Sequence, residues 1–343
     1  MAFKITLQPS GHGFAAPADE PILQAALDAG FNLPYGCRNG ACGTCKGKVL
    51  EGHVDFGIAQ EHALPLAERA GGMALFCCAK PLSDLVLEVK EIGAIKDIPL
   101  KTMPCRVQHL EKLADDVMLM TLKLPTNERL QFLAGQYIEF LLKDGKRRAF
   151  SLANAPHDDE FLQLHLRLIP GGTFTEHVFH AMHEKEILRF EGPHGSFFLR
   201  EDSDKPIILL AGGTGFAPIK GIVEHAIHNK IMRPMTLYWG ARNRAGLYMN
   251  DLPQQWAAAH PHIDYVPVLS DPDAADDWNG RSGLVHEAVL ADFADLSGHQ
   301  VYACGAPAMI EAAKRDFTAR GLPDGEFYAD IFSFATPAAG TKA

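Results

Sequence analysis

The chain has 343 residues, of which 47% are hydrophobic and 22% charged, and its formal net charge at pH 7 is −10. This length allows two or three domains, and the composition is that of an ordinary globular protein. No basic cluster is present that could follow a phosphate backbone, so we expect no nucleic-acid binding. The N-terminus lacks the apolar core of a signal peptide, and apolar runs such as residues 207–211 are too short to span a bilayer. We therefore expect a cytoplasmic monomer that makes no membrane contact.

Residues 1–93 have the pattern of a small α+β domain. Residues 3–7 and 84–90 alternate between apolar and polar side chains, as strands do. Between them, Asp19 is placed to cap a short helix, and Gly30 has the character of a helix stop. A domain of this size buries little apolar surface, so a bound metal centre would contribute to its stability.

Three cysteines in this domain, Cys37, Cys42 and Cys45, have the spacing C-x4-C-x2-C in a glycine-rich loop, and a fourth follows at Cys77 or Cys78. This is the ligand pattern of a plant-type [2Fe–2S] cluster. The glycines let the backbone turn tightly, and its N–H groups can point at the sulfurs. A C-x2-C pair can also belong to a zinc site or a redox disulfide, but zinc has no use for a third cysteine at this offset. The seven cysteines of the chain suit a reducing compartment.

Residues 94–104 contain glycine and proline without clear periodicity and are predicted to form a linker. Residues 105–203 then read as short strands broken by turn residues, at 117–122, 136–141 and 161–168, with one helical stretch after Gly172. This pattern predicts a closed antiparallel β-barrel.

Two short motifs in the barrel have the chemistry of a flavin site. Arg148 offers a guanidinium to phosphates, Phe150 a flat ring to lie on a flavin, and Ser151 a hydroxyl for the flavin ring nitrogen. The second motif opens the helix and offers free N–H groups and the positive end of a helix dipole to a pyrophosphate. Its residues are Gly171, Gly172 and Thr173. Taken alone, each motif is weak, because an arginine on a strand is more often a solvated surface residue.

Residues 204–335 alternate between apolar strands and helix-length stretches, with strands expected at 206–210, 235–239, 263–269 and 300–303. This alternation predicts a doubly wound α/β domain with a parallel sheet. The last residues, 336–343, are predicted to be a disordered tail.

Two motifs in this third domain lie where ligands bind in open sheets. The first is a glycine-rich turn between a strand and a helix, which lets the backbone approach a dinucleotide. It consists of Gly212, Gly213, Thr214 and Gly215, and a helix cap without a ligand is its alternative interpretation. The second, Cys304 and Gly305, ends a later strand, where a buried structural cysteine would be the usual interpretation.

Taken together, these motifs resemble the ferredoxin–NADP reductase superfamily fused to a plant-type ferredoxin. The residues that carry the resemblance are 148–151, 171–175, 212–218 and 304–307. The resemblance implies a β-grasp-type ferredoxin domain with Cys77 as the fourth ligand. It also implies FAD, because the ferredoxin part leads the chain, and Ser151 and Cys304 as catalytic residues. Phe150 departs from the tyrosine of the superfamily motif, so the aromatic face is kept and the phenolic hydroxyl is lost.

The three inferred cofactors form one path, from NAD(P)H to FAD to the [2Fe–2S] cluster and then to a separate electron-acceptor protein. The resemblance implies that this acceptor is either an oxygenase component or a sugar dehydratase of the glucoseen type. An alternative is an electron carrier or binding module that uses only the ferredoxin domain, with a flavin domain that no longer functions.

We expect NADH to be preferred over NADPH. Members of the superfamily that use NADP hold its 2′-phosphate with a Ser-Arg pair, and here Asp271 fills the arginine position after Ser270. A carboxylate repels a phosphate and can instead bind a ribose hydroxyl. Arg242 and Arg244 favour the opposite outcome, because either can reach a phosphate.

Overall fold

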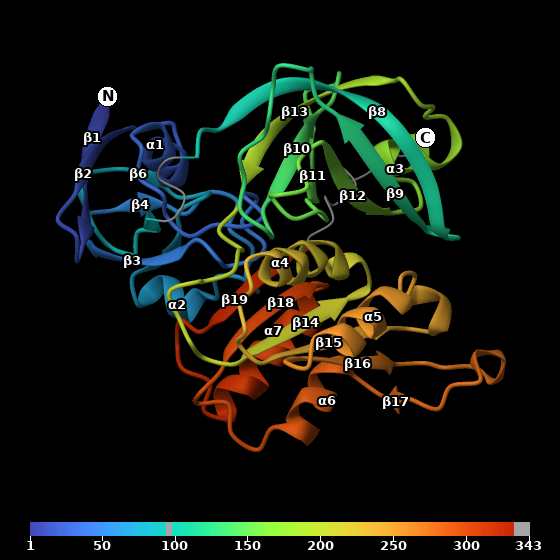
Figure 1. The fold of residues 1–343 in the computed structure, drawn as a ribbon. Coiled ribbons are helices and arrows are strands. Elements are labelled where there is room, and N and C mark those ends of the chain that lie inside the picture. Colours follow the sequence, from blue (N-terminus) through green and yellow to red (C-terminus); the bar gives the residue numbers. More distant parts are fainter. Residues whose placement is uncertain (94–97, 333–343) are drawn as a thin grey trace, which may run out of the picture. The chain divides into compact units, whose positions relative to one another are not determined.

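The computed structural model describes residues 1–93 and 98–332 (Figure 1). The described chain divides into two compact units, one built on Met1–Gly93 and the other on Ala94–Asp330. Residues 101–104, which we assigned to the linker, already belong to a strand, and the predicted tail 336–343 lies outside the described residues. Within the described ranges, no helix has both the length and the apolar character that crossing a bilayer requires.

The first unit is built on a five-stranded sheet with strand order β2-β1-β7-β3-β5, beside a small β4-β6 ladder. The alternation predicted for the first strand places Ile5 and Leu7 on its buried face, and these two residues pair in parallel with Leu85 and Leu87. The elements of this unit are β1 (Ala2–Gln8), β2 (Gly13–Pro17), α1 (Ile22–Asp28), β3 (Lys46–Glu51), β4 (Val54–Asp55), α2 (Leu66–Ala70), β5 (Met73–Leu75), β6 (Lys80–Pro81) and β7 (Leu85–Glu88).

Helix α1 begins differently from the prediction. Pro21 holds the N-cap position and no side chain caps the helix, so the predicted cap at Asp19 is wrong. A proline suits this position because its φ is fixed and it has no N–H to satisfy. The predicted stop at Gly30 is confirmed: Gly30 follows the C-cap residue and has a φ of +82°, a conformation that favours glycine.

The first half of the second unit is a six-stranded antiparallel sheet with strand order β11-β10-β13-β8-β9-β12. Its two edge strands meet through a bridge between Leu152 and Leu164 and a hydrogen bond from the Ala153 N–H to the Gln163 carbonyl, 2.7 Å long. The sheet therefore closes into the predicted barrel. Its elements are β8 (Lys101–Ala114), β9 (Val117–Lys123), β10 (Tyr137–Leu141), β11 (Arg147–Ser151), β12 (Phe161–Arg167), α3 (Thr173–His180) and β13 (Ile187–His194).

The second half is a six-stranded sheet with strand order β17-β16-β15-β14-β18-β19, in which β14 to β18 pair in parallel. The order reverses beside β14, which lies between β15 and β18. This reversal brings Ala211 of β14 opposite Cys304 of β18, at the carboxyl ends where open sheets bind ligands. The elements are β14 (Ile207–Gly212), η2 (Gly213–Gly215), α4 (Phe216–His228), β15 (Met235–Ala241), η3 (Arg244–Gly246), α5 (Asp251–Ala259), β16 (Ile263–Leu269), η4 (Ala274–Asp276), β17 (Arg281–Ser282), α6 (Val285–Asp292), β18 (Gln300–Gly305), α7 (Pro307–Ala319) and β19 (Phe327–Ile331).

Candidate functional site

The four predicted cluster cysteines come together in the first unit. The Cys37 N–H donates to the Cys42 Sγ at 3.4 Å, and the Cys42 N–H donates back to the Cys37 Sγ at 3.3 Å. Cys45 and Cys77 form a second pair through their thiols. Converging thiols with backbone donors directed at the sulfurs fit a [2Fe–2S] cluster.

The loop that carries three of these cysteines, residues 36–45, is called the cluster loop below. It turns through two glycines in the left-handed region, Gly40 with a φ of +77° and Gly43 with a φ of +75°. Gly36 leaves room for a ligand, because a Cβ there would lie 3.3 Å from the Cys42 Sγ. Side chains at these positions would strain the turn or push the sulfur aside.

In each thiol pair, the shared hydrogen bond shifts the two pKa values in opposite directions. A hydrogen bond from Cys37 is the main cause that lowers the pKa of Cys42, to about 6. In the same way, a hydrogen bond from Cys45 lowers the pKa of Cys77 to about 4. The same hydrogen bonds, followed by burial, raise the pKa of Cys37 and of Cys45 above the usual value, so each pair favours one thiolate and one thiol. A bound metal would need all four as thiolates.

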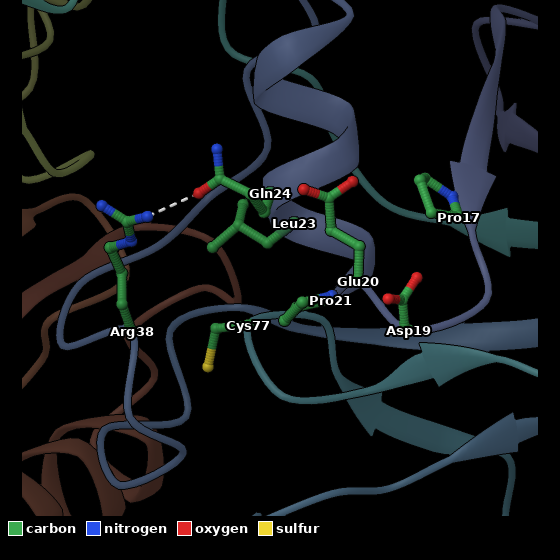
Figure 2. Close-up of a pocket in the computed structure, with 8 residues that line it drawn as sticks. All are labelled: Pro17, Asp19, Glu20, Pro21, Leu23, Gln24, Arg38 and Cys77. Carbon is green, nitrogen blue, oxygen red and sulfur yellow. Dashed lines mark hydrogen bonds between the residues drawn. The ribbon is translucent and has the colours of Figure 1, made fainter.

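A groove of about 540 Å³ opens beside Cys77 (Figure 2). Arg38 and Gln24 lie on one side of it, joined by a hydrogen bond of 2.6 Å from the Arg38 Nη2 to the Gln24 Oε1. Asp19 and Glu20 line another part of the groove. Burial, followed by the charges of Asp28 and Asp19, raises the pKa of Glu20. The groove therefore brings charges of both signs close to a cluster ligand.

In the barrel, the structure places Arg148 and Phe150 on β11. Among the described residues, the Arg148 guanidinium has one hydrogen bond, from Nη1 to the Arg147 carbonyl at 2.8 Å, so most of its donors are available to a ligand. The Phe150 ring is half-buried and packs against Phe140 and Phe174, with ring centroids 5.9 Å and 5.5 Å apart. Phe174 belongs to α3, so the two flavin motifs are in contact.

The first turn of α3 has no side-chain cap. Its N-cap is Gly172, which leaves N–H groups of this turn free for a ligand. A Cβ at Gly172 would lie 2.9 Å from both the Ile169 carbonyl and the Thr175 Oγ1, so only glycine fits. The N–H of Gly171 donates to the Glu176 carboxylate at 3.0 Å and is therefore already used.

The glycine turn after β14 packs directly on the end of β18. A Cβ at Gly215 would lie 2.1 Å from the Cys304 carbonyl oxygen, and one at Gly305 would lie 3.2 Å from the Gly212 Cα. The turn continues through Gly213 and the buried Thr214 into α4. Glycine is needed here because the two backbone segments are in contact. These segments, residues 212–215 and 304–305, are the two motifs predicted to bind the nucleotide.

Cys304 shares a buried polar group with two residues from distant parts of the chain. The Ser151 Oγ donates to the Asp330 Oδ2 at 3.1 Å, and the Cys304 thiol lies 3.9 Å from the same oxygen. None of the three residues is more than 8% exposed. Burial, followed by the charge of Asp330, raises the pKa of the Cys304 thiol well above its usual value, so the thiol stays protonated. We call these three residues the Ser–Asp–Cys group.

The sequence predicted Ser151 and Cys304 as catalytic residues but did not point to Asp330, which the structure places beside both. Asp330 lies on β19, and its carboxylate is 8% exposed. The available signal was an acidic residue next to Ile331 near the end of an otherwise strand-like run, but nothing in the sequence connects that run to Ser151.

Arg167 on β12 is a second residue that sequence reasoning missed. Its Nη1 pairs with Asp116 at 3.0 Å, whereas its Nε and Nη2 are buried and have no hydrogen-bond partner in the described part of the chain. The Nη2 lies 3.5 Å from where a Cβ of Gly213 would be. Two unused guanidinium donors beside the glycine turn suit a phosphate of a dinucleotide.

The structure brings Asp271 and Arg242 together beyond the ends of β16 and β15. The Asp271 N–H donates to the Arg242 carbonyl at 2.8 Å, and the Asp271 side chain is exposed. Arg244 is held by Asp276, whose carbonyl accepts from the Arg244 Nη1 at 3.1 Å. Of the two arginines, Arg242 is therefore the nearer competitor of Asp271 for a group on the ribose.

Three segments of the chain match known family models. Residues 5–82 match the 2Fe-2S iron-sulfur cluster binding domain, residues 104–199 the oxidoreductase FAD-binding domain, and residues 209–315 the oxidoreductase NAD-binding domain. The predicted cofactors, a [2Fe–2S] cluster, FAD and NAD(H), are thereby confirmed, as is the multidomain fold class.

Curated relatives match over nearly the whole chain. The CDP-6-deoxy-L-threo-D-glycero-4-hexulose-3-dehydrase reductase of Yersinia pestis is 41% identical over 97% of this chain and 99% of its own length. The reductase component DmpP of phenol 2-monooxygenase from Pseudomonas sp. (strain CF600) is 36% identical over 99% of this chain and 97% of its own length. Among solved structures, the Amycolatopsis cytochrome P450 reductase GcoB superimposes with a TM-score of 0.79 at 35% identity, covering 96% of this chain and 98% of that one.

Proposed function

The chain belongs to the ferredoxin–NADP reductase superfamily, among the reductases with an N-terminal plant-type [2Fe–2S] domain, and we propose that it supplies electrons from NADH to a sugar dehydrase. It is an oxidoreductase of the electron-transfer reductase type. When bound, FAD takes two electrons from the nicotinamide and releases them singly, which suits a one-electron [2Fe–2S] centre. The observation that supports the proposal is that one chain holds both the four converging cysteines and the buried Ser–Asp–Cys group.

For FAD, we propose that Arg148 and the uncapped first turn of α3 bind the phosphates. The Arg148 guanidinium has free donors, and the first turn of α3, which begins at Thr173, offers N–H groups at the positive end of the helix dipole. Phe150 would contribute its exposed ring surface to the flavin ring, as an aromatic face without a hydroxyl.

For NADH, we propose that the turn formed by Gly212 to Gly215 carries the backbone of the dinucleotide site, with Arg167 supplying charge to its pyrophosphate. Two donors of Arg167 are buried and unused among the described residues, and they are aimed at this turn. The neutral thiol of Cys304 lies at the end of the neighbouring strand, where it would contact the nicotinamide. Ser151 is oriented by Asp330, whose Oδ2 accepts a hydrogen bond from the Ser151 Oγ at 3.1 Å and keeps the hydroxyl in one position.

We propose that NADH is preferred over NADPH because Asp271 lies beyond the carboxyl end of β16, at the same edge of the parallel sheet as the glycine turn that follows β14. An exposed carboxylate repels the 2′-phosphate and can accept a hydrogen bond from the 2′-hydroxyl. Arg244 is engaged with Asp276, which leaves Arg242 as the residue that would favour NADPH.

For the acceptor, we favour a nucleotide-sugar dehydrase over an oxygenase component. The Yersinia dehydrase reductases are 41% identical to this chain, whereas the reductases of terephthalate dioxygenase and phenol monooxygenase are 33–36% identical over a similar length. The groove at Cys77 is where we place the docking of this acceptor, because it joins the protein surface to a cluster ligand. All seven cysteines are free thiols, as a reducing cytoplasm would keep them, and we propose that the chain acts there as a monomer.

The test is an anaerobic rapid-mixing experiment. Purified protein should show flavin and iron–sulfur absorption bands together, and NADH should bleach both. Mixing the reduced protein with the Yersinia CDP-6-deoxy-L-threo-D-glycero-4-hexulose-3-dehydrase should then restore the iron–sulfur band faster than mixing it with the terephthalate dioxygenase oxygenase component. Faster reoxidation by the oxygenase would reverse the choice of acceptor. Iron–sulfur bands without flavin bands would support the carrier alternative instead.

A further inference from the structure

A fifth thiol lies beside the proposed cluster ligands. The Cys78 Sγ is 3.5 Å from the Cys77 Sγ, within hydrogen-bond distance for two sulfur atoms, and Cys78 is 5% exposed. A buried thiol at this distance can have one of three roles: it can bind iron itself, it can fill space, or it can donate a hydrogen bond to the neighbouring sulfur.

The turn that carries Cys77 and Cys78 is tied to the rest of the site. The Phe76 N–H donates to the Cys45 carbonyl at 3.0 Å, and the Cys78 N–H donates to the Leu75 carbonyl at 3.0 Å. These bonds fix the turn relative to another cluster ligand. Of the two adjacent cysteines, Cys77 is the one whose thiol is hydrogen-bonded to the thiol of Cys45. We therefore take Cys77 as the fourth ligand and Cys78 as its neighbour.

The surroundings of Cys78 leave its sulfur little freedom. A Cβ at Gly40 would lie 2.7 Å from the Cys78 Sγ, and a Cβ at Gly57 would lie 2.5 Å from the Cys78 carbonyl oxygen. Both glycines have left-handed backbone conformations, with φ of +77° and +59°. The absence of side chains at these two positions creates the space that Cys78 occupies, and the cluster loop closes over the sulfur.

We propose that Cys78 is a positioning residue whose S–H donates a hydrogen bond to the Cys77 thiolate and so raises the reduction potential of the cluster. The inference rests on the proposed function only in that the cluster is present with Cys77 as a ligand. A reduced cluster carries one more negative charge than an oxidised one, so a donor to a ligand sulfur stabilises the reduced form more. An S–H group is a weak hydrogen-bond donor. We therefore expect the energy of this hydrogen bond, and with it the shift in reduction potential, to be at the lower end of the range for hydrogen bonds to charged groups.

The experiment is a redox titration of the whole protein with a chemical reductant, followed by the EPR signal of the reduced cluster. Dithionite reduces the cluster without NADH, so the result does not depend on the flavin, the nucleotide site or the acceptor. The variants are Cys78→Ala, which removes the donor, and Cys78→Ser, which keeps one. Cys105→Ala is the matched control, because Cys105 is a buried cysteine on β8 of the other unit.

We expect Cys78→Ala to keep a full cluster and to be harder to reduce, by up to about tenfold in the reduced-to-oxidised ratio at a fixed potential, or about 59 mV for a one-electron couple. The reduction potential of Cys78→Ser should lie closer to that of the unmodified protein than the potential of Cys78→Ala does. The potential of Cys105→Ala should equal that of the unmodified protein. An unchanged potential in Cys78→Ala, or equal potentials in the alanine and serine variants, would overturn the proposal. A Cys78→Ala protein without a cluster would also overturn it, because a residue that only tunes the potential is not needed for assembly.

Discussion

The cluster loop and the Ser–Asp–Cys group are two reactive centres of one chain that are assembled in opposite ways. The cluster loop carries three of the four proposed cluster ligands within residues 36–45. In the Ser–Asp–Cys group, Asp330 is 179 residues from Ser151 and 26 residues from Cys304. The first centre is therefore set mainly by chain connectivity, whereas the second exists only when the barrel and the parallel sheet have both folded.

The two centres also differ in what surrounds their cysteines. In the first unit, hydrogen bonds between neighbouring thiols lower the pKa of one member of each pair, Cys42 and Cys77, and raise that of the other, Cys37 and Cys45. In the second unit, complete burial next to a carboxylate raises the pKa of Cys304. The comparison teaches that a cysteine favours the thiolate where it accepts a hydrogen bond from a neighbouring thiol and stays neutral where it is buried beside a carboxylate.

The largest effect that we expect is from Cys42→Ser. The variant should lose its cluster and its electron delivery to a protein acceptor, because one of four ligands is replaced. NADH-dependent reduction of ferricyanide should remain, since this dye takes electrons from the flavin directly. Absorption spectra and dye assays measure both. Loss of flavin and of dye reduction in this variant would show that the two centres are not independent.

A substitution in the Ser–Asp–Cys group should slow reduction of the flavin and leave the cluster intact. Asp330→Asn removes the negative charge that orients Ser151 and faces the Cys304 thiol, so reduction of the flavin by NADH should slow by about a hundredfold. The cluster, titrated with dithionite, should be unaffected. Asp295→Asn is a matched control, because Asp295 is a fully exposed aspartate that bonds only to Ser297 among the described residues. A rate equal to that of the control would mean that Asp330 has only a structural role.

The preference for NADH tests a second contrast, between two aspartates of the second unit. Asp330 is buried, whereas Asp271 is exposed and is proposed to act on the nucleotide directly. We expect kcat/KM to be roughly tenfold to a hundredfold higher for NADH than for NADPH, and Asp271→Arg to narrow this ratio by about tenfold. Arg242→Ala should widen the ratio, as the opposite change. A kcat/KM for NADPH at or above that for NADH in the unmodified protein would contradict the assignment.

We expect the smallest effect, on NADH-dependent dye reduction, from removal of the first unit. Removing residues 1–95 cuts the chain where the two compact units divide, so the remaining protein should be yellow and should reduce ferricyanide with NADH at a rate within about twofold of the full chain. Flavin content and the dye assay are the measurements, with the Cys42→Ser protein as the control that lacks only the cluster. A colourless or insoluble fragment would show that the flavin centre needs the first unit.

The sequence alone determined the three cofactors and the order of the matched segments, and it predicted the cluster ligands, because each depends on a short motif whose residues are close together in the chain. The C-x4-C-x2-C spacing and the glycine turn at residues 212–215 specify their geometry locally. The start of α1 was misjudged, since both Asp19 and Pro21 precede the helix and only the folded backbone distinguishes their roles.

Tertiary structure decided which residues complete those motifs. Asp330 and Arg167 become important because folding buries the Asp330 side chain beside Ser151 and two guanidinium nitrogens of Arg167 beside Gly213. Burial is a property of the whole unit that no local pattern encodes. Cys78 is a similar case: next to Cys77 in sequence, it was an ambiguous neighbour. The structure shows that Gly40 packs against its sulfur and Gly57 against its carbonyl group, so three separate segments hold this sulfur beside the proposed ligand Cys77.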